Sequence, residues 1–285
     1  MSPWALVLVL VAAVAHACWN LLAKKASQAD GLVFLWLVAA TSTVLWSPLF
    51  AGFLLVTGAR VTWTELAVTG CSAAIHLGYF VLLQRGYGAG DLSVVYPVAR
   101  GTGPMLASLV AVMFLGERPG PIGVAGIVLV GVGVFLMSGG RSGDLKGLAF
   151  GLAVGLFIAA YTVWDSRVVS AFAVPPLVLN YLGETGRALV LAPAVLGGRR
   201  RELIAPTWRE HRFQIIGAAV LIFVSYLLVL FAFTMAPVTV VAPAREVSVL
   251  IAVVLGGRLL AEGDLRRRLL AGAVILGGVV AIAFS

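Results

Sequence analysis

Ten apolar runs, each about as long as a membrane-crossing helix, dominate this sequence. An α-helix needs about 20 apolar residues to span the hydrocarbon core of a bilayer. Charged residues make up only 11% of the 285 residues, against about 25% in soluble domains, and they gather between the runs. This segregation excludes an ordinary soluble enzyme and predicts an all-α polytopic membrane protein with ten transmembrane helices. The expected spans are 3–24, 31–56, 65–86, 92–115, 121–139, 145–165, 175–197, 212–235, 238–258 and 268–284.

The two halves of the sequence repeat. A shift of 145 residues places Trp19 on Trp164, Arg100 on Arg245 and, further along, Pro48 on Pro193, Trp63 on Trp208 and Glu117 on Glu262. The glycine-rich joint GGRSGDLKG divides the chain into two expected domains, 1–140 and 141–285. Each half holds five spans, an odd number, so the second half is expected to enter the membrane in the opposite orientation. Such inverted 5+5 repeats are typical of secondary carriers that work by alternating access.

Basic residues are distributed unequally between the two sides of the expected helix bundle. The loops on one side carry 14 Lys and Arg residues, and those on the other side carry 3. The positive-inside rule makes the rich side cytoplasmic and leaves both termini outside. The net charge of +8 therefore suits anionic headgroups better than nucleic acid. No basic stretch precedes the first apolar run, so we expect 3–24 to be a retained span and not a cleaved signal.

The sequence contains no motif for an enzyme, a metal or a cofactor. Zinc-ligand spacings, nucleotide-binding loops and nucleophile elbows are all absent. Cys18 and Cys71 both lie in apolar runs and are expected to be packing residues. We therefore expect a carrier that is not an enzyme and that uses no nucleotide, no cofactor and no metal.

Four stretches resemble a known family: HACWNLLAKKAS at 16–27, YPVARGTGPMLASLVAVMFLGERPGPIGVAGIVLVGVGV at 96–134, APAREVSVLIAVVLGGRLLAEG at 242–263 and AGAVILGGVVAIAF at 271–284. On these residues the whole chain is similar to the EamA-type members of the drug/metabolite transporter superfamily. The resemblance implies ten helices in two inverted five-helix halves around a central cavity. It also implies movement of small metabolites, often export of amino acids or toxic compounds. Members usually keep both termini in the cytoplasm, against the charge count, so the orientation stays open.

Two arginines occupy equivalent places in the fourth and ninth spans. Arg100 follows Pro97 and precedes Pro104, and Arg245 follows Pro243. Proline deletes a backbone hydrogen bond and kinks a helix, and at membrane depth the freed carbonyls are tolerated where they face protein or a watery cavity. We therefore expect two kinked helices that present arginines to the substrate. The alternative is that each arginine pairs with a neighbouring carboxylate.

The seventh span carries a glutamate and an arginine three residues apart. Glu184 and Arg187 can form an ion pair on one helix face, with Asn180 one turn earlier. In the alternative interpretation Glu184 is a protonatable coupling site, since burial favours a neutral carboxyl.

Histidines in the first and third spans are also able to carry a proton, although a lone histidine on an apolar helix often only packs. The proton-coupling candidates are Glu184, His16 and Glu246, besides His76.

Aromatic and amide side chains complete the expected site. The substrate-binding candidates are Arg100, Arg245, Tyr96, Trp19, Asn20, Trp164, Tyr161, Asn180 and Glu184.

The expected interior has one excess positive charge, from Arg100, Arg187 and Arg245 against Glu184 and Glu246. Guanidinium groups bind carboxylates and phosphates in a bidentate manner. We therefore expect export of a small anionic or zwitterionic metabolite, such as an amino acid or related carboxylate. A multidrug cation exporter and a lipid-headgroup flippase remain alternatives.

The expected partners are a small-molecule substrate and membrane lipids, with proton or exchange coupling and no nucleic acid. Glycines of the fifth and tenth spans suit close packing, either of these two helices on each other or on a second copy, so both a monomer and a homodimer are open. The expected location is a bacterial cytoplasmic (inner) membrane.

Overall fold

The computed structural model describes residues 2–26, 28–89, 92–138, 145–248, 250–251 and 265–284. These residues form ten α-helices and no strand. Five of the described helices are long and apolar enough to cross a bilayer: α1, α2, α3, α6 and α8. The helices are α1 (Pro3–Lys25), α2 (Gly31–Thr57), α3 (Trp63–Ala89), α4 (Leu92–Phe114), α5 (Pro121–Ser138), α6 (Leu145–Ser170), α7 (Pro176–Leu196), α8 (Arg200–Met235), α9 (Val238–Ala244) and α11 (Leu265–Ala283).

The outer surface of the bundle is apolar. Large side chains such as Val56, Leu55 and Phe114 are mostly exposed. In water such a surface would be unfavourable, whereas in a bilayer it is solvated by acyl chains. The helical structure and this surface are those of an integral membrane protein.

Two expected spans differ from the observed helices. The stretch 197–212, expected to be a loop, is helical from Arg200, and α8 bends at His211, whose backbone (φ −117°, ψ 19°) is not helical. Before the bend the helix is rich in charged residues, so apolar length alone did not predict it. In the ninth span α9 already ends at Ala244, and residues 252–258 of that span lie outside the described part of the chain.

The prolines expected to kink helices have different surroundings. Pro97 and Pro104 lie within the uninterrupted helix α4, and Ser108 Oγ donates to the carbonyl oxygen of Pro104. Pro243 lies one residue before the end of α9, and a turn follows at Arg245 and Glu246.

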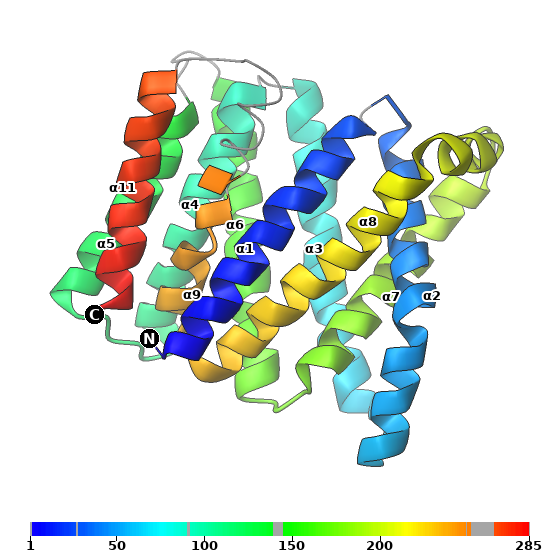
Figure 1. Ribbon diagram of the computed structural model, residues 1–285, viewed down its shortest axis with the longest axis horizontal. Helices are drawn as coiled ribbons and strands as arrows, with labels where there is room; N and C mark the ends of the chain where they lie inside the picture. Colours follow the sequence, from blue (N-terminus) through cyan, green and yellow to red (C-terminus); the bar gives the residue numbers. More distant parts are fainter. Residues whose placement is uncertain are drawn as a thin grey trace.

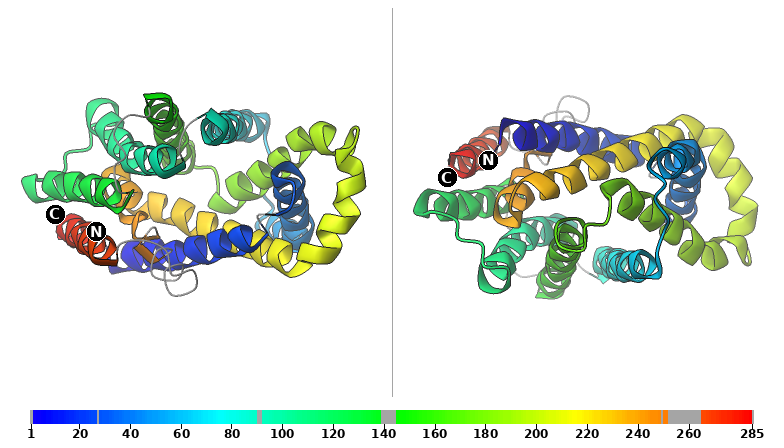
Figure 2. Two further views of the ribbon diagram at one scale, coloured as in Figure 1. Left: turned by 90° about the horizontal axis from the view of Figure 1, so that it is seen from above. Right: turned by 90° about the horizontal axis from the view of Figure 1, so that it is seen from below.

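Helices from the two halves pack on one another throughout the bundle. The largest contacts between the halves join α4 to α6, α5 to α11, α1 to α8, α3 to α6 and α2 to α7. Viewed along the helices, α5 and α11 lie at one edge of the bundle, and α2, α7 and the first part of α8 lie at the opposite edge (Figure 2). Along the helix axes, both termini lie at one end, and the starts of α2 and α8 lie at the other (Figure 1).

Glycines allow α5 and α11 to approach closely. A Cβ on Gly126 would lie 2.6 Å from the carbonyl oxygen of Gly278, and a Cβ on Gly133 would lie 3.0 Å from that of Ala271. Only residues without side chains permit two helix backbones to meet at this distance. Between the two interpretations of these glycines, the structure shows contact of the two helices with each other.

Candidate functional site

A cavity with a volume of about 450 Å³, called the large cavity below, lies between α2, α3, α7 and α8. The lining residues Asp30, Arg85 and Arg200 are at least partly exposed and lie at the starts of α2 and α8 and near the end of α3; these three are called the mouth below. Most of its wall is apolar, from side chains such as Leu35, Leu77 and Phe80. Its polar lining consists of Ser72, His76, Asn180, Glu184, Arg187 and Tyr226 besides the residues of the mouth.

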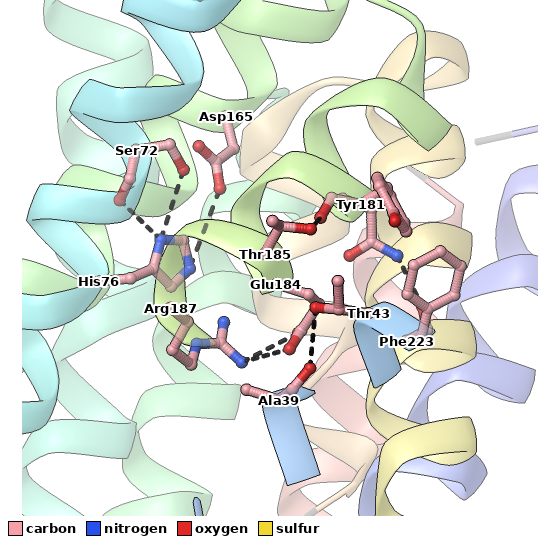
Figure 3. A network of polar contacts seen from close by, with 11 residues as sticks. Ala39, Thr43, Ser72, His76, Asp165, Tyr181, Glu184, Thr185, Arg187 and Phe223 are labelled. Carbon is pink, nitrogen blue, oxygen red and sulfur yellow. Dashed lines mark hydrogen bonds and ion pairs between the residues drawn. The ribbon is translucent and has the colours of Figure 1, made fainter. Parts of the chain in front are cut away.

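An ion pair forms one wall of this cavity. Nη1 of Arg187 lies 2.9 Å and 3.1 Å from the two carboxylate oxygens of Glu184, on successive turns of α7 (Figure 3). The guanidinium also lies 5.4 Å from the centre of the Phe80 ring. Glu184 is buried, and Arg187 is partly open to the cavity. The wall therefore presents a positive and a negative group beside an aromatic surface.

A second polar cluster closes the inner end of the cavity. Tyr226 of α8 donates a hydrogen bond to Oδ2 of Asp165 on α6. The same oxygen lies 4.0 Å from Nε2 of His76 on α3 (Figure 3). Nδ1 of His76 lies 2.9 Å from the backbone oxygen of Ser72. Three helices thus converge on one carboxylate, which is completely buried.

Asn180 and Tyr181 hold α7 in place beside the cavity. The Asn180 amide donates to the backbone oxygen of Phe223 on α8, and the Tyr181 ring stacks on Phe50 of α2. With one amide hydrogen engaged, Asn180 keeps its second amide hydrogen and its carbonyl oxygen for a ligand.

A second, nearly closed cavity lies between α1, α4, α8 and α9, with a volume of about 10 Å³. Its polar lining consists of His16, Arg100, Arg245, Ser225 and Ser248. Nη2 of Arg100 lies 3.2 Å from Oε1 of Glu246 and 3.3 Å from the Ser248 hydroxyl. This space holds about one water molecule, too little for a metabolite in this conformation.

Tyr226 lies between the two cavities. It lines the large cavity, and the Arg245 guanidinium, which lines the small one, lies 5.8 Å from the centre of its ring. Its neighbour Ser225 lines the small cavity and donates to the backbone oxygen of Ala12.

The residues expected to bind substrate fall into three groups. Asn180 and Glu184 line the large cavity, whereas Arg100 and Arg245 line the small one with His16. The others lie outside both linings: Trp19 donates to His16 Nδ1, Asn20 donates to the His16 backbone oxygen, Trp164 donates to the Val68 backbone oxygen, and Tyr161 stacks on His76. The side chains of Tyr96 and Pro97 lie outside the described residues.

Sequence reasoning gave too little weight to Asp165, His76 and Tyr226. The expected sixth span ended at 165, so Asp165 was placed near a helix end, whereas α6 continues to Ser170 and buries it. The repeat offers a signal, because Asp165 corresponds to Asn20, and only the second half carries a charge there.

Among the described residues no group of three or more His, Cys, Asp or Glu side chains is arranged to hold a metal ion. Both cysteines are free thiols.

Comparison with known proteins gives one family and one fold. The model of the EamA-like transporter family matches residues 3–139 and again residues 145–284. A solved structure titled "Crystal structure of protein" has a TM-score of 0.74 and 16% sequence identity, covering 100% of this chain and 98% of that chain. At that identity the likeness concerns the fold alone. No curated protein matches the sequence.

Proposed function

Because this chain belongs to the EamA-like transporter family, it is a membrane transporter, and we propose that it moves a small zwitterionic metabolite with an apolar side group. Amino acids such as leucine and phenylalanine have this chemistry. The proposed mode is secondary active export by alternating access, in a bacterial cytoplasmic membrane.

The large cavity is the observation that carries this proposal. A volume of about 450 Å³ suits one small molecule. The Glu184–Arg187 pair offers a carboxylate to a substrate ammonium and a guanidinium to a substrate carboxylate. The apolar wall and the Phe80 ring suit an uncharged side group.

The ion pairs favour a zwitterion over a simple anion. Two of the three interior arginines, Arg100 and Arg187, are each paired with a glutamate. The third, Arg245, lies beside the closed cavity, and the buried Asp165 carboxyl group offsets the excess positive charge that favoured an anion. A multidrug cation exporter would not need a guanidinium in the cavity wall, where Arg187 is bonded to Glu184.

Alternating access is supported by the way the halves contact each other. A shift of 145 residues converts the Gly126–Gly278 contact into the contact between Ala271 and Gly133. It likewise converts the pairing of α1 with α8 into that of α6 with α3. This exchange is what two inverted repeats would produce, and exchange of shapes between such halves would close one cavity while opening the other.

Equilibrium exchange in proteoliposomes tests the proposal without any ion gradient. Vesicles loaded with unlabelled leucine or phenylalanine are expected to take up the labelled compound, whereas succinate and tetraphenylphosphonium are not exchanged. Arg187→Gln is expected to lose this exchange, because the substrate carboxylate loses its partner. Thr185→Val on the same helix is the control, since Thr185 bonds to the Tyr181 backbone and does not line the cavity. Exchange of tetraphenylphosphonium alone would overturn the zwitterion proposal in favour of a cation exporter.

A further inference from the structure

We propose that Asp165, with His76 and Tyr226, forms the proton-binding site that makes this carrier a proton antiporter. The inference rests on the proposed function, because it assigns the coupling step of the same cavity. The three candidates that the sequence suggested for this role, Glu184, His16 and Glu246, have other partners in the structure. Glu184 and Glu246 are each bonded to an arginine, and Nδ1 of His16 accepts a hydrogen bond from Trp19.

Asp165 is a buried carboxylate without a basic counter-ion. Its side chain has no exposed surface, and no lysine or arginine of the described residues lies within ion-pair distance. Oδ2 accepts the Tyr226 hydroxyl, and Oδ1 accepts no hydrogen bond from the described residues. An ionised carboxylate in such a place is costly, and uptake of a proton removes that cost.

His76 faces this carboxylate with a lone pair. Its Nδ1 lies 2.9 Å from the backbone oxygen of Ser72, and a carbonyl oxygen can only accept, so Nδ1 carries the hydrogen. In the neutral ring Nε2 is then an acceptor, and it points at Oδ2 of Asp165 from 4.0 Å. At this separation no hydrogen bond joins the two acceptors, and one proton on either atom would turn their facing lone pairs into a donor and an acceptor.

The proton reaches this position from the large cavity. His76 and Tyr226 both line that cavity, and the His76 side chain is 15% exposed. Water in the cavity protonates Nε2. When the two side chains approach to hydrogen-bond distance, this N–H bond breaks and an O–H bond forms at Oδ2. A neutral acid beside a neutral imidazole is favoured over a buried ion pair, so the proton stays on Asp165.

The charged groups nearest to Asp165 and His76 have other neighbours. Arg100 is paired with Glu246, and Arg187 with Glu184. Arg245 is the nearest cation to the Tyr226 ring, on the side of the small cavity. The groups that face Asp165 or His76 are Tyr161 and Tyr226 by contact, with Arg187, Arg245, Arg100 and Glu246 at longer range.

Proton and substrate compete through charge. With Asp165 ionised the cluster carries one negative charge at the inner end of the cavity, and this charge attracts a substrate ammonium group. With Asp165 protonated the cluster is neutral, and the attraction is lost. Asp165 therefore either binds the proton or, when ionised, attracts the substrate, but it does not do both at once. Movement of the substrate in one direction then requires movement of the proton in the other.

Tyr226 connects proton uptake to the wall between the cavities. Its hydroxyl is held by the Asp165 carboxylate, and a hydrogen bond to a charged acceptor is about twice as strong as one to a neutral acceptor. Protonation of Asp165 weakens this bond and releases the ring that separates the large cavity from Arg245 and Ser225.

Infrared difference spectra of the full-length protein in nanodiscs, recorded between alkaline and acidic pH, test the site with the proton itself as the probe. We expect a carbonyl-stretch band of a buried protonated carboxyl group, absent in Asp165→Asn and retained in Glu184→Gln and Glu246→Gln. In Tyr226→Phe, which keeps the carboxyl group, the midpoint of the band should move by about one pH unit towards alkaline pH. A band that persists in Asp165→Asn, or an unchanged midpoint in Tyr226→Phe, would overturn the proposal.

The same proteoliposomes separate this inference from the proposed function. The labelled leucine is placed inside the vesicles, and the outside is made acidic. This pH gradient should drive the wild type and Thr185→Val to export leucine against its concentration gradient. Asp165→Asn, whatever its absolute rate of exchange, should not respond to the gradient. Wild-type exchange that does not respond to the pH gradient would overturn the antiport proposal but not the proposed substrate. Absence of wild-type exchange with every probe would overturn the proposed substrate, and the infrared band would still test the proton site.

Discussion

At the scale of single residues, buried charge in this protein is arranged in two different ways. Glu184 and Glu246 each have a guanidinium within 3.2 Å, whereas Asp165 has only a hydroxyl and an imidazole. A buried pair is strongly destabilised when one partner is removed, because the other charge is left alone. A buried carboxyl group with neutral partners instead has the option of binding a proton.

The first prediction concerns the Glu184–Arg187 pair. Arg187→Ala should lower the free energy of unfolding by about 3–5 kcal/mol, since it leaves Glu184 buried and unpaired. The double variant Glu184→Gln with Arg187→Gln should cost much less. Thermal unfolding of both variants in the same detergent measures the difference, and equal losses would mean that the pair contributes no mutual stabilisation.

Asp30, at the mouth of the cavity, should contribute a pH-dependent part of the protein's stability. Partial burial acts to raise the pKa of Asp30, but the hydrogen bonds from Val33 and Leu32 and the Arg200 guanidinium outweigh it and lower this pKa below its ordinary value. The stabilisation is therefore fully present above the ordinary carboxyl pKa of about 3.9, and it is lost as the pH falls through the lower folded value.

Two substitutions test this role. Asp30→Ala should cost about 1 kcal/mol near neutral pH, because it removes the cap of α2. Asp30→Asn keeps a capping oxygen but has no charge to lose, so the part of the acid-induced loss due to Asp30 should disappear. Melting temperatures from neutral to acidic pH give both effects, and identical acid profiles for Asp30→Asn and wild type would contradict the assignment.

At the scale of helices, the crossing of α5 and α11 gives the clearest prediction. Gly126→Ala should destabilise the protein by about 1–3 kcal/mol, because the new methyl group meets a backbone oxygen that has no room to move. Gly277→Ala on α11 is the matched control, since its Cβ would have no neighbour within 4 Å. The control should be neutral or slightly stabilising, because alanine favours helix. Equal melting temperatures for the two variants would show that the crossing tolerates a side chain.

Helices were predictable from the sequence where apolar length determines them, and less so where charge or proline intervenes. α2 begins at Gly31 as expected, because Asp30 caps it with hydrogen bonds to Leu32 and Val33. The start of α8 at Arg200 was missed, since its first turns are charged and Pro206 lies within them. Pro243 was expected to kink the ninth span, and there α9 ends at Ala244, a turn follows at 245–246, and residues 247–248 and 250–251 are helical again. A proline alone does not specify how sharply a helix is interrupted.

The site was less predictable than the helices, because partner choice depends on rotation of the helices about their axes. The sequence suggested Glu184 with Arg187 from their spacing within one helix, and the structure contains that pair. The bond between Arg100 and Glu246 joins α4 to the segment after α9, and the cluster at Asp165 joins α3, α6 and α8. No spacing along the chain encodes contacts between helices that are so far apart in sequence.

At the scale of the whole molecule, the mouth of the large cavity gives a basis for the orientation. The mouth contains Arg85 and Arg200, two of the 14 basic loop residues. The positive-inside rule favours a cytoplasmic position for such residues, and we propose that the mouth faces the cytoplasm and that the structure is the inward-open form.

Cysteine accessibility in whole cells tests this orientation, in a protein whose Cys18 and Cys71 are replaced by alanine. Gly183→Cys should be labelled by a membrane-impermeant maleimide only from the side that labels Arg201→Cys, because Gly183 lines the cavity with open space at its Cβ. Ser225→Cys, in the closed cavity, should stay unlabelled. Labelling of Gly183→Cys from the side of the termini would reverse the assignment of the mouth.

The contact between Gly126 and Gly278 limits how the sequence can diverge. Each glycine would place a Cβ less than 3 Å from the backbone of the other, so a side chain at either position forces the two helices apart. Cavity residues can be exchanged one at a time as a substrate changes. These two glycines belong to opposite halves of the chain, and both depend on the same distance between the backbones of α5 and α11. In descendants of this protein both positions should remain glycine, or both should change where the two helices cross differently. At these positions the two halves of the chain therefore do not evolve independently.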